Sequence, residues 1–256
     1  MISWQKNKNF GLVLGGGGVR GFFHMGVVAA IQELGVKIEE ISGTSIGAVI
    51  GLMYAANQEA NFRKIMEDLD FFELIKAIMM GTKNDKEMEN FLKKYISVKK
   101  FEDLKIKTSI NATDINNKKE IIFDKGNIYP GVVASMTIPG IFTPLKYEGN
   151  FLIDGGISNN IPMTLIKKSK KIIVSDISGP IKKVDEKTSA TDVLYSAFAV
   201  MQQNLAWEKA KNMKNKKIIR LRLNDEKTFI LDFRKKNYQY LFDLGYESLM
   251  KIKNKL

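Results

Sequence analysis

Two short apolar runs near the start of the chain each lead directly into a glycine-rich turn and then into a helical pattern. The first run, FGLVL, occupies residues 10–14, and the second, KIEEIS, occupies residues 37–42. Repeated strand–turn–helix units favour parallel strands, because a parallel pair needs a crossover connection that is usually a helix. The pattern therefore predicts an α/β fold with three layers, α/β/α, around a mainly parallel central sheet.

The rest of the chain continues this alternation without an internal repeat or a low-complexity linker. Residues 105–115 and 119–124 are predicted to pair as strands, and a long helix is predicted over residues 190–212, where apolar side chains recur at helical spacing. The other predicted elements are helical segments within 59–96, strands at 147–156, 170–178 and 215–223, a helix with Pro162 in its first turn, and a C-terminal helix at 238–256. We expect residues 1–256 to form a single domain.

The chain is strongly basic, with 40 Lys and Arg residues against 28 Asp and Glu and a formal net charge of +12. Such a surface suits anionic partners, although lysines scattered as in IKKSKKI also fit an ordinary solvated surface. No basic block is interleaved with aromatic residues, so stacking on single-stranded nucleic acid is not expected. We expect no nucleic-acid partner, and peripheral contact with an anionic membrane stays open.

Cysteine is absent, and histidine occurs once, at His24. The absence of cysteine excludes disulfides, thiolate metal sites and a cysteine nucleophile, and a single histidine leaves few of the usual zinc ligands. We therefore expect neither a metal nor a cofactor. The first residues, MISWQKNKNF, lack the long apolar core of a signal peptide, so we expect a cytoplasmic protein.

The segment GTSIG, residues 43–47, has the pattern G-x-S-x-G between the second predicted strand and a helix that is apolar on nearly all sides. In this context the pattern is typical of a nucleophile elbow, in which Gly43 and Gly47 allow the sharp turn that presents the hydroxyl of Ser45. The following helix adds positive dipole potential where negative charge would develop. Ser45 is therefore a candidate nucleophile, and a serine that only caps the helix is the alternative.

The glycines after the first strand permit a second interpretation, because Gly16, Gly18 and Gly21 fit the dinucleotide pattern G-x-G-x-x-G. That fold needs an acidic residue near the end of the second strand, whereas Glu39 and Glu40 lie early in it. No G-K-[ST] follows the glycines, so a Walker A loop is absent as well. The same backbone can instead bind another anion, including the oxyanion of an acyl-transfer intermediate.

A serine nucleophile needs a base, and the sequence offers two candidates. His24 precedes Ser45 and lies within the first predicted helix, where a packed imidazole is expected rather than a catalytic one. Asp154 ends a predicted strand and is followed by Gly155 and Gly156, which would bring its carboxylate to the same sheet edge as Ser45. The sequence therefore predicts a Ser45–Asp154 pair.

Several blocks of the chain, in this order, resemble the patatin-like phospholipases, a family of serine acyl hydrolases that use a Ser–Asp dyad. GGGGVRG is similar to the family's glycine-rich oxyanion block, GTSIG to its nucleophile elbow and DGG to its aspartate block. ASMTIPGIFTPL, residues 134–145, is similar to the segment between nucleophile and aspartate. The resemblance covers residues 10–166, and no diagnostic motif follows residue 170.

The resemblance implies a function and a set of roles. Ser45 would attack a fatty acyl ester of a phospholipid or lysophospholipid and form an acyl-enzyme, with Asp154 as the base. Backbone N–H groups among Gly16, Gly17 and Gly18 would form the oxyanion hole, and the neighbouring Arg20, together with the elbow and DGG glycines, would support the loops. A general carboxylesterase or thioesterase with the same dyad, and a non-catalytic lipid-binding module, are the alternatives.

Residues 69–80, LDFFELIKAIMM, present a broad apolar helix face. This face is either that of an ordinary core helix or that of a lid or acyl-channel wall, in which flexible methionines would suit a variable acyl chain. In the second case residues 81–90 would form the hinge. The sequence indicates neither the oligomeric state nor the headgroup that is preferred.

Overall fold

The computed structural model describes residues 9–81, 85–179, 184–186, 188–225 and 234–256. Within these ranges the parallel strands are β1 (Phe10–Leu14), β2 (Ile38–Gly43), β3 (Lys107–Asp114), β7 (Lys171–Asp176) and β8 (Lys217–Arg222). Antiparallel pairing adds β4 (Lys119–Phe123), β5 (Leu145–Tyr147) and β6 (Asn150–Asp154). The order is β5-β6-β3-β2-β1-β7-β8, with β4 paired to β3. The predicted mainly parallel α/β sheet is confirmed.

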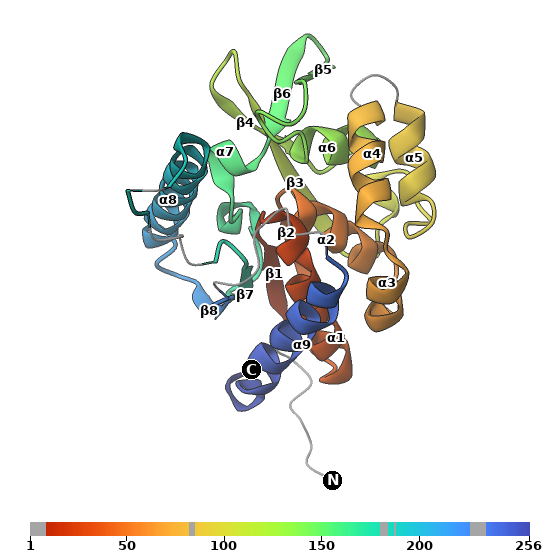
Figure 1. The fold of residues 1–256 in the computed structure, drawn as a ribbon. Helices are drawn as coiled ribbons and strands as arrows, with labels where there is room; N and C mark the ends of the chain where they lie inside the picture. The colour runs from red at the N-terminus through yellow and green to blue at the C-terminus, as the bar shows by residue number, and fades with distance from the viewer. Residues whose placement is uncertain (1–8, 82–84, 180–183, 187, 226–233) are drawn as a thin grey trace.

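Helices cover both faces of this sheet (Figure 1). The described helices are α1 (Gly21–Glu33), α2 (Ile46–Ala56), α3 (Phe62–Asp68), α4 (Phe71–Gly81), α5 (Asp85–Leu92), α6 (Ile128–Ser135), α7 (Gly156–Asn159), α8 (Ala190–Lys211) and α9 (Lys236–Met250), with short 3-10 turns η1 (Gly18–Arg20), η2 (Phe101–Asp103), η3 (Met163–Leu165) and η4 (Lys253–Lys255). None of these helices combines the length and the apolar content that a membrane crossing requires.

Two hydrophobic cores of unequal size lie on the two faces of the sheet. Successive residues of a strand point to opposite faces, so Leu12 and Leu14 of β1 enter the larger core, which α1, α2 and α9 cover. Val13 enters the smaller core, which is covered by the turn around η3 and by the C-terminal half of α8, including Ala206. One layer of the fold is therefore thick and the other thin.

The prediction of a helix with Pro162 in its first turn is wrong. The chain instead makes the single 3-10 turn η3, and Pro162 has φ −78° and ψ 53°, outside the helical region. Ile161, Met163 and Ile166 on either side are buried in the smaller core. Their burial keeps this segment flat against the sheet, which leaves no helix to form before β7.

The predicted helices over residues 69–80 and 190–212 form as α4 and α8. The inner side of α4 is buried in the larger core through Phe71, Leu74 and Ile78, while Phe72 remains exposed. The core-helix interpretation is confirmed for that inner side, and the lid stays a prediction. Residues 82–84 of the suggested hinge lie outside the described residues.

The C-terminal helix α9 packs directly on α1 through two reciprocal glycines. A Cβ at Gly26 of α1 would collide with the carbonyl oxygen of Phe242, and a Cβ at Gly245 of α9 would collide with the carbonyl oxygen of Phe23. Both collisions are with backbone atoms, which cannot rotate away as a side chain can. The two helices therefore approach as closely as they do because neither carries a side chain at the crossing point.

We expect Gly245→Ala to destabilise the fold. In an isolated helix this substitution stabilises by about 1 kcal/mol, because alanine has the higher helix propensity. Here the added methyl group collides with the backbone of α1, so the substitution should destabilise instead. We expect it to lower the free energy of unfolding by about 1–3 kcal/mol or more. Urea unfolding measures the change, with Glu247→Ala on the exposed side of α9 as the control. Equal or greater stability of Gly245→Ala would contradict the close packing.

Candidate active site

The turn between β2 and α2 holds Ser45 in a backbone conformation that is rare for a residue with a side chain. Its φ is 55° and its ψ is −126°, and the residue is almost completely buried. A Cβ at Gly43 would lie 2.5 Å from the carbonyl oxygen of Gly47, and one at Gly47 would collide with the carbonyl oxygen of Leu14. Both glycines of the predicted elbow are therefore needed for close backbone packing.

The structure brings Ser45 and Asp154 together. The hydroxyl of Ser45 donates to Oδ2 of Asp154 at 2.7 Å, and the N–H of Gly156 donates to Oδ1 at 2.6 Å. Asp154 is the last residue of β6, and its position opposite Ala112 of β3 sets it at the edge where β2 ends. Burial raises the pKa of the Asp154 carboxyl to about 6, although the hydrogen bonds from Gly156 and Ser45 oppose this rise.

A short segment at the end of α6 holds the backbones of both residues. The hydroxyl oxygen of Ser135 accepts the N–H of Ser45 at 2.8 Å, and the carbonyl of Thr137 accepts the N–H of Asp154 at 2.9 Å. Sequence reasoning missed these two positions, although they lie in the segment ASMTIPGIFTPL. Since Ser135 is 90 residues away from Ser45 in the chain, only the fold reveals the contact.

The glycine loop after β1 lies against Ser45, but its amides are not equivalent. A Cβ at Gly16 would lie 3.3 Å from Cβ of Ser45, and the Gly16 N–H donates to the carbonyl of Asn160 at 3.0 Å. This amide, which we expected among the oxyanion donors, is therefore already hydrogen-bonded. Among the described residues, no hydrogen bond uses the N–H of Gly17 or Gly18. Of the three amides predicted as oxyanion donors, those of Gly17 and Gly18 are thus the two that the described structure leaves unused.

His24 is completely buried and serves as a scaffold for the glycine loop. Its Nε2 is 2.8 Å from the carbonyl of Gly15, so Nε2 carries the proton, and Nδ1 accepts from the hydroxyl of Ser175 at 2.7 Å. Burial lowers the pKa of His24 to about 4. The imidazole is therefore neutral at ordinary pH with both nitrogens engaged, as expected for a packed histidine.

Arg20 connects the glycine loop to the end of β7, the strand that pairs with β1 on the side opposite β2. Its guanidinium donates to the carbonyl of Ser178 at 2.7 Å, just after β7, and lies so close to Gly179 that a Cβ there would collide with it. The side chain is buried, and burial lowers its pKa, which the charge of Asp225 opposes. This geometry fits the supporting role expected for Arg20.

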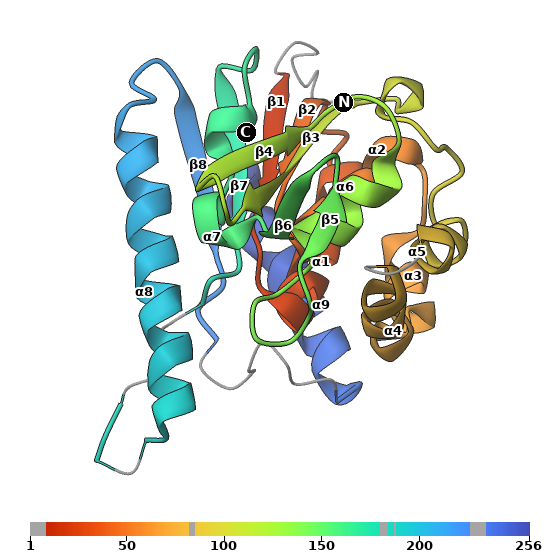
Figure 2. The same ribbon diagram turned by 90° about the horizontal axis from the view of Figure 1, so that it is seen from above.

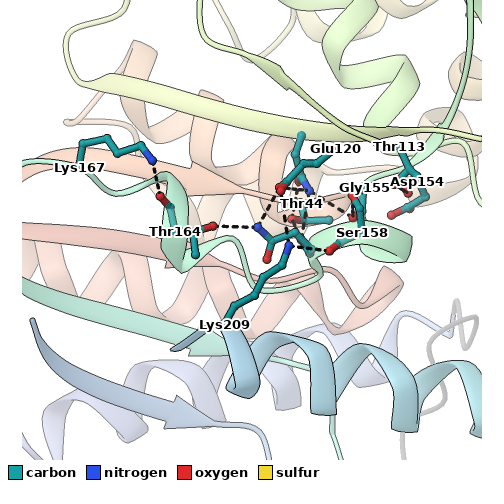
Figure 3. A network of polar contacts seen from close by, with 11 residues as sticks. Thr44, Thr113, Glu120, Asp154, Gly155, Ser158, Thr164, Lys167 and Lys209 are labelled. Carbon is teal, nitrogen blue, oxygen red and sulfur yellow. Dashed lines mark hydrogen bonds and ion pairs between the residues drawn. The ribbon is translucent and has the colours of Figure 1, made fainter. Parts of the chain in front are cut away.

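A buried polar network anchors the elbow to four other elements (Figure 3). The Thr44 hydroxyl lies 2.7 Å from Oδ1 of Asn111 and 2.9 Å from the carbonyl of Asn159. The amide groups of Asn111 and Asn159 both donate to Glu120, and Lys209 of α8 lies 3.5 Å from the same carboxylate. The residue before the candidate nucleophile is thus connected to β3, β4, α7 and α8.

The site combines a serine hydroxyl, a hydrogen-bonded carboxylate with a raised pKa, and unused backbone amides. These groups suffice for attack on a carbonyl carbon and for stabilising the resulting negative oxygen. Within the described ranges, no group of three or more His, Cys, Asp or Glu side chains is placed to hold a metal ion.

Asp154→Asn should make the protein more stable at neutral pH. The pKa of the carboxyl is about 6 in the folded state against an ordinary value of 3.8, so between pH 3.8 and pH 6 the folded state binds more protons than the unfolded state. The free energy of unfolding of the wild type therefore falls as pH rises through this window, by up to about 3 kcal/mol. Asparagine does not ionise, so the variant keeps its free energy of unfolding over this pH range, and its side chain has nearly the same shape as aspartate.

The measurement is urea unfolding of both proteins on either side of that window. We expect the advantage of Asp154→Asn to be full above pH 6 and to vanish below pH 4. A difference that does not depend on pH would contradict the raised pKa of Asp154.

Comparisons with known proteins identify the family of this chain. The family model described as patatin-like phospholipase matches residues 12–166. Proteins named lysophospholipase NTE1 from Meyerozyma guilliermondii and Debaryomyces hansenii are each 31% identical over 236 and 234 residues, which is 85% of this chain but only 16% and 15% of theirs. The chain thus spans less than a fifth of the length of these relatives.

Solved structures show the same fold. VipD from Legionella pneumophila matches 97% of this chain and 67% of its own, with a TM-score of 0.60 at 16% identity. The type III effector protein ExoU matches 96% of this chain and 53% of its own, with a TM-score of 0.51 at 13% identity. At such identities the likeness concerns the fold alone. The family model, however, covers more than half of the chain, and the chain therefore belongs to the patatin-like phospholipase family, whose members are lipid-hydrolysing enzymes.

Proposed function

We propose that the chain is a serine lipid acyl hydrolase that cleaves fatty acyl esters of phospholipids or lysophospholipids. The observation that carries the proposal is the 2.7 Å hydrogen bond from the Ser45 hydroxyl to Asp154, made by a serine with a φ of 55°. A buried serine in a strained turn, aimed at a buried carboxylate, has the geometry of an activated nucleophile.

The proposed reaction proceeds in two halves. Oγ of Ser45 attacks the acyl carbonyl carbon while its proton passes to Oδ2 of Asp154, and the carbonyl oxygen becomes an oxyanion. Collapse of this intermediate breaks the ester bond, and Asp154 returns the proton to the departing alcohol. Water then attacks the acyl carbonyl carbon of acyl-Ser45 while its proton passes to the same carboxylate. The acyl–Oγ bond breaks, Asp154 returns the proton to Oγ of Ser45, and the fatty acid is released.

Three features of the site support these steps. The raised pKa of Asp154, about 6, makes it a stronger base than an exposed aspartate. The unused N–H groups of Gly17 and Gly18 are available to the oxyanion, and donors of this type contribute about 10²–10³ in turnover each. Ser135 and Thr137 hold the two backbones, so the proton moves over a short, fixed distance.

Lysophospholipids are the first substrates to assay, because the similar curated proteins are named lysophospholipases. We propose a cytoplasmic location with peripheral access to membranes. A general carboxylesterase with the same dyad would prefer short soluble esters, and comparing lysophosphatidylcholine with a short-chain ester separates the two activities.

We expect Ser45 to be the residue that a fluorophosphonate labels. Intact mass should rise by a single adduct, and peptide mapping should locate it at Ser45. Asp154→Asn should reduce labelling and turnover by about 10³-fold or more, because the hydroxyl loses its base. Asp114→Asn is the matched control. Asp114 is also buried at the end of a strand, but its carboxylate accepts hydrogen bonds from Asn116 and Asn117 and not from Ser45.

Two outcomes would contradict the dyad. One is a wild-type protein that is folded yet neither labelled nor active with any ester, which would favour the lipid-binding module. The other is a folded His24→Ala variant without labelling or activity, since His24 is proposed to hold the glycine loop and not to accept the proton of Ser45.

The pH dependence of turnover provides an independent test. Asp154 must be ionised to accept the proton, so kcat/KM for a soluble ester should fall about tenfold per pH unit below pH 6. Above that pH it should level off. A rate that stays constant down to pH 4 would exclude a base with the pKa given for Asp154.

A further inference from the structure

The long helix α8 carries an apolar stripe that nothing in the described structure covers. Leu194, Phe198, Met201 and Leu205 follow the spacing i, i+4, i+7, i+11, which places them along one side of a helix. They are 56%, 38%, 65% and 37% exposed. We call these four residues the α8 stripe. Exposed large apolar side chains in such a continuous row are typical of an interaction surface.

The stripe lies at the edge of the sheet that contains the candidate active site. Because α8 connects the parallel strands β7 and β8, it begins at the carboxyl ends of the strands, where Ser45 and Asp154 also lie. Only its C-terminal half packs in the smaller core, and its N-terminal half extends beyond the body of the molecule (Figure 2). Gln202 borders the site directly, because a Cβ at Gly156 would lie 2.9 Å from its side-chain nitrogen.

Further exposed apolar side chains surround the same edge. Ile115 follows β3 and Phe151 is the second residue of β6, and the Ile115 N–H donates to the Phe151 carbonyl at 3.1 Å. Ile141 lies four residues after Thr137, whose carbonyl holds Asp154. All three are more than a third exposed, and we call them the apolar rim. The rim thus adds exposed apolar side chains next to the two segments that hold Asp154.

Basic residues also lie along α8, on the side that faces β8. A hollow of about 340 Å³ at its C-terminal half is lined by Trp207, Lys211, Arg220 and Arg222, among others. Lys211, Arg220 and Arg222 are exposed, although Arg220 also pairs with Asp176 and stacks on Trp207. Together with the net charge of +12, these cations give this edge of the protein a positive charge. An exposed apolar row on a strongly basic protein suits the boundary between headgroups and acyl chains of an anionic membrane.

We infer that the α8 stripe and the apolar rim form a docking surface for an anionic phospholipid bilayer, with the candidate active site facing the lipid. The inference rests on the lipid acyl hydrolase activity proposed above, because that activity takes its substrate from such a surface. Apolar side chains enter the acyl boundary, and the positive net charge of the protein attracts the anionic headgroups. A second copy of the chain covering the stripe is the competing occupant.

The test measures binding without turnover, so that its outcome is independent of catalysis. Ser45→Ala protein is floated with vesicles of equimolar phosphatidylcholine and phosphatidylserine, and with vesicles of phosphatidylcholine alone. The stripe variant carries Leu194→Gln, Phe198→Gln, Met201→Gln and Leu205→Gln. The matched control carries Phe72→Gln, Met79→Gln and Met80→Gln, which are comparably exposed on α4. Thermal unfolding and light scattering establish folding and molecular mass.

We expect Ser45→Ala to bind the mixed vesicles and the stripe variant to bind them about tenfold or more weakly, because four apolar side chains no longer enter the lipid. The α4 control should bind as before, and vesicles without phosphatidylserine should bind less protein. Unchanged binding by the stripe variant, or no binding by Ser45→Ala, would overturn the inference. So would a dimer that the stripe substitutions convert into a monomer, since the stripe would then be a subunit interface. Failure of ester hydrolysis, tested separately, would instead refute the proposed function.

Discussion

The candidate site depends on the strained turn at Ser45. A residue with a side chain adopts a left-handed conformation such as this one at a cost of order 1–3 kcal/mol, so the surrounding structure must hold it there. Gly43 and Gly47 allow the close backbone packing that forms the turn, and Ser135 accepts the serine N–H. The aspartate, the glycine loop and the buried network at Thr44 are all positioned around this turn.

The sequence predicted the parts of this arrangement that are encoded locally. A strand followed by GTSIG, and another ended by DGG, identify Ser45 and Asp154 because the turn chemistry is contained in five or fewer neighbouring residues. Ser135, Asn160 and Glu120 escaped notice because their residue types are common at any surface and the contacts are distant in sequence. Ser135 lies 90 positions from Ser45, Asn160 144 from Gly16 and Glu120 39 from Asn159. The Gly16 amide shows the same limit, since its bond to Asn160 depends on where the chain returns after β6.

Periodicity also predicted which residues share one side of a helix, but not what covers that side. The patterns at residues 69–80 and 190–212 both indicate amphipathic helices, yet α4 buries its apolar side in the larger core whereas α8 leaves much of its own exposed. The difference arises from the thin layer, where only the C-terminal half of α8 has a sheet beneath it. Coverage is a property of the assembled layers, and no local pattern contains it. The expectation of a single domain over residues 1–256 stays a prediction.

The place of β1 in the middle of the sheet determines how much of the chain must fold together. β1 pairs with β2 on one side and with β7 on the other, and β7 begins after residue 166, where the family match ends. A fragment confined to the matched residues would turn β1 into an edge strand, with an open row of N–H and C=O groups that can pair with other chains. It would also lose α9 and uncover Phe22, which stacks on Tyr238. The C-terminal third, which carries no family motif, thus protects the residues 12–166 that hold Ser45 and Asp154 from aggregation, because β7 covers the edge of β1.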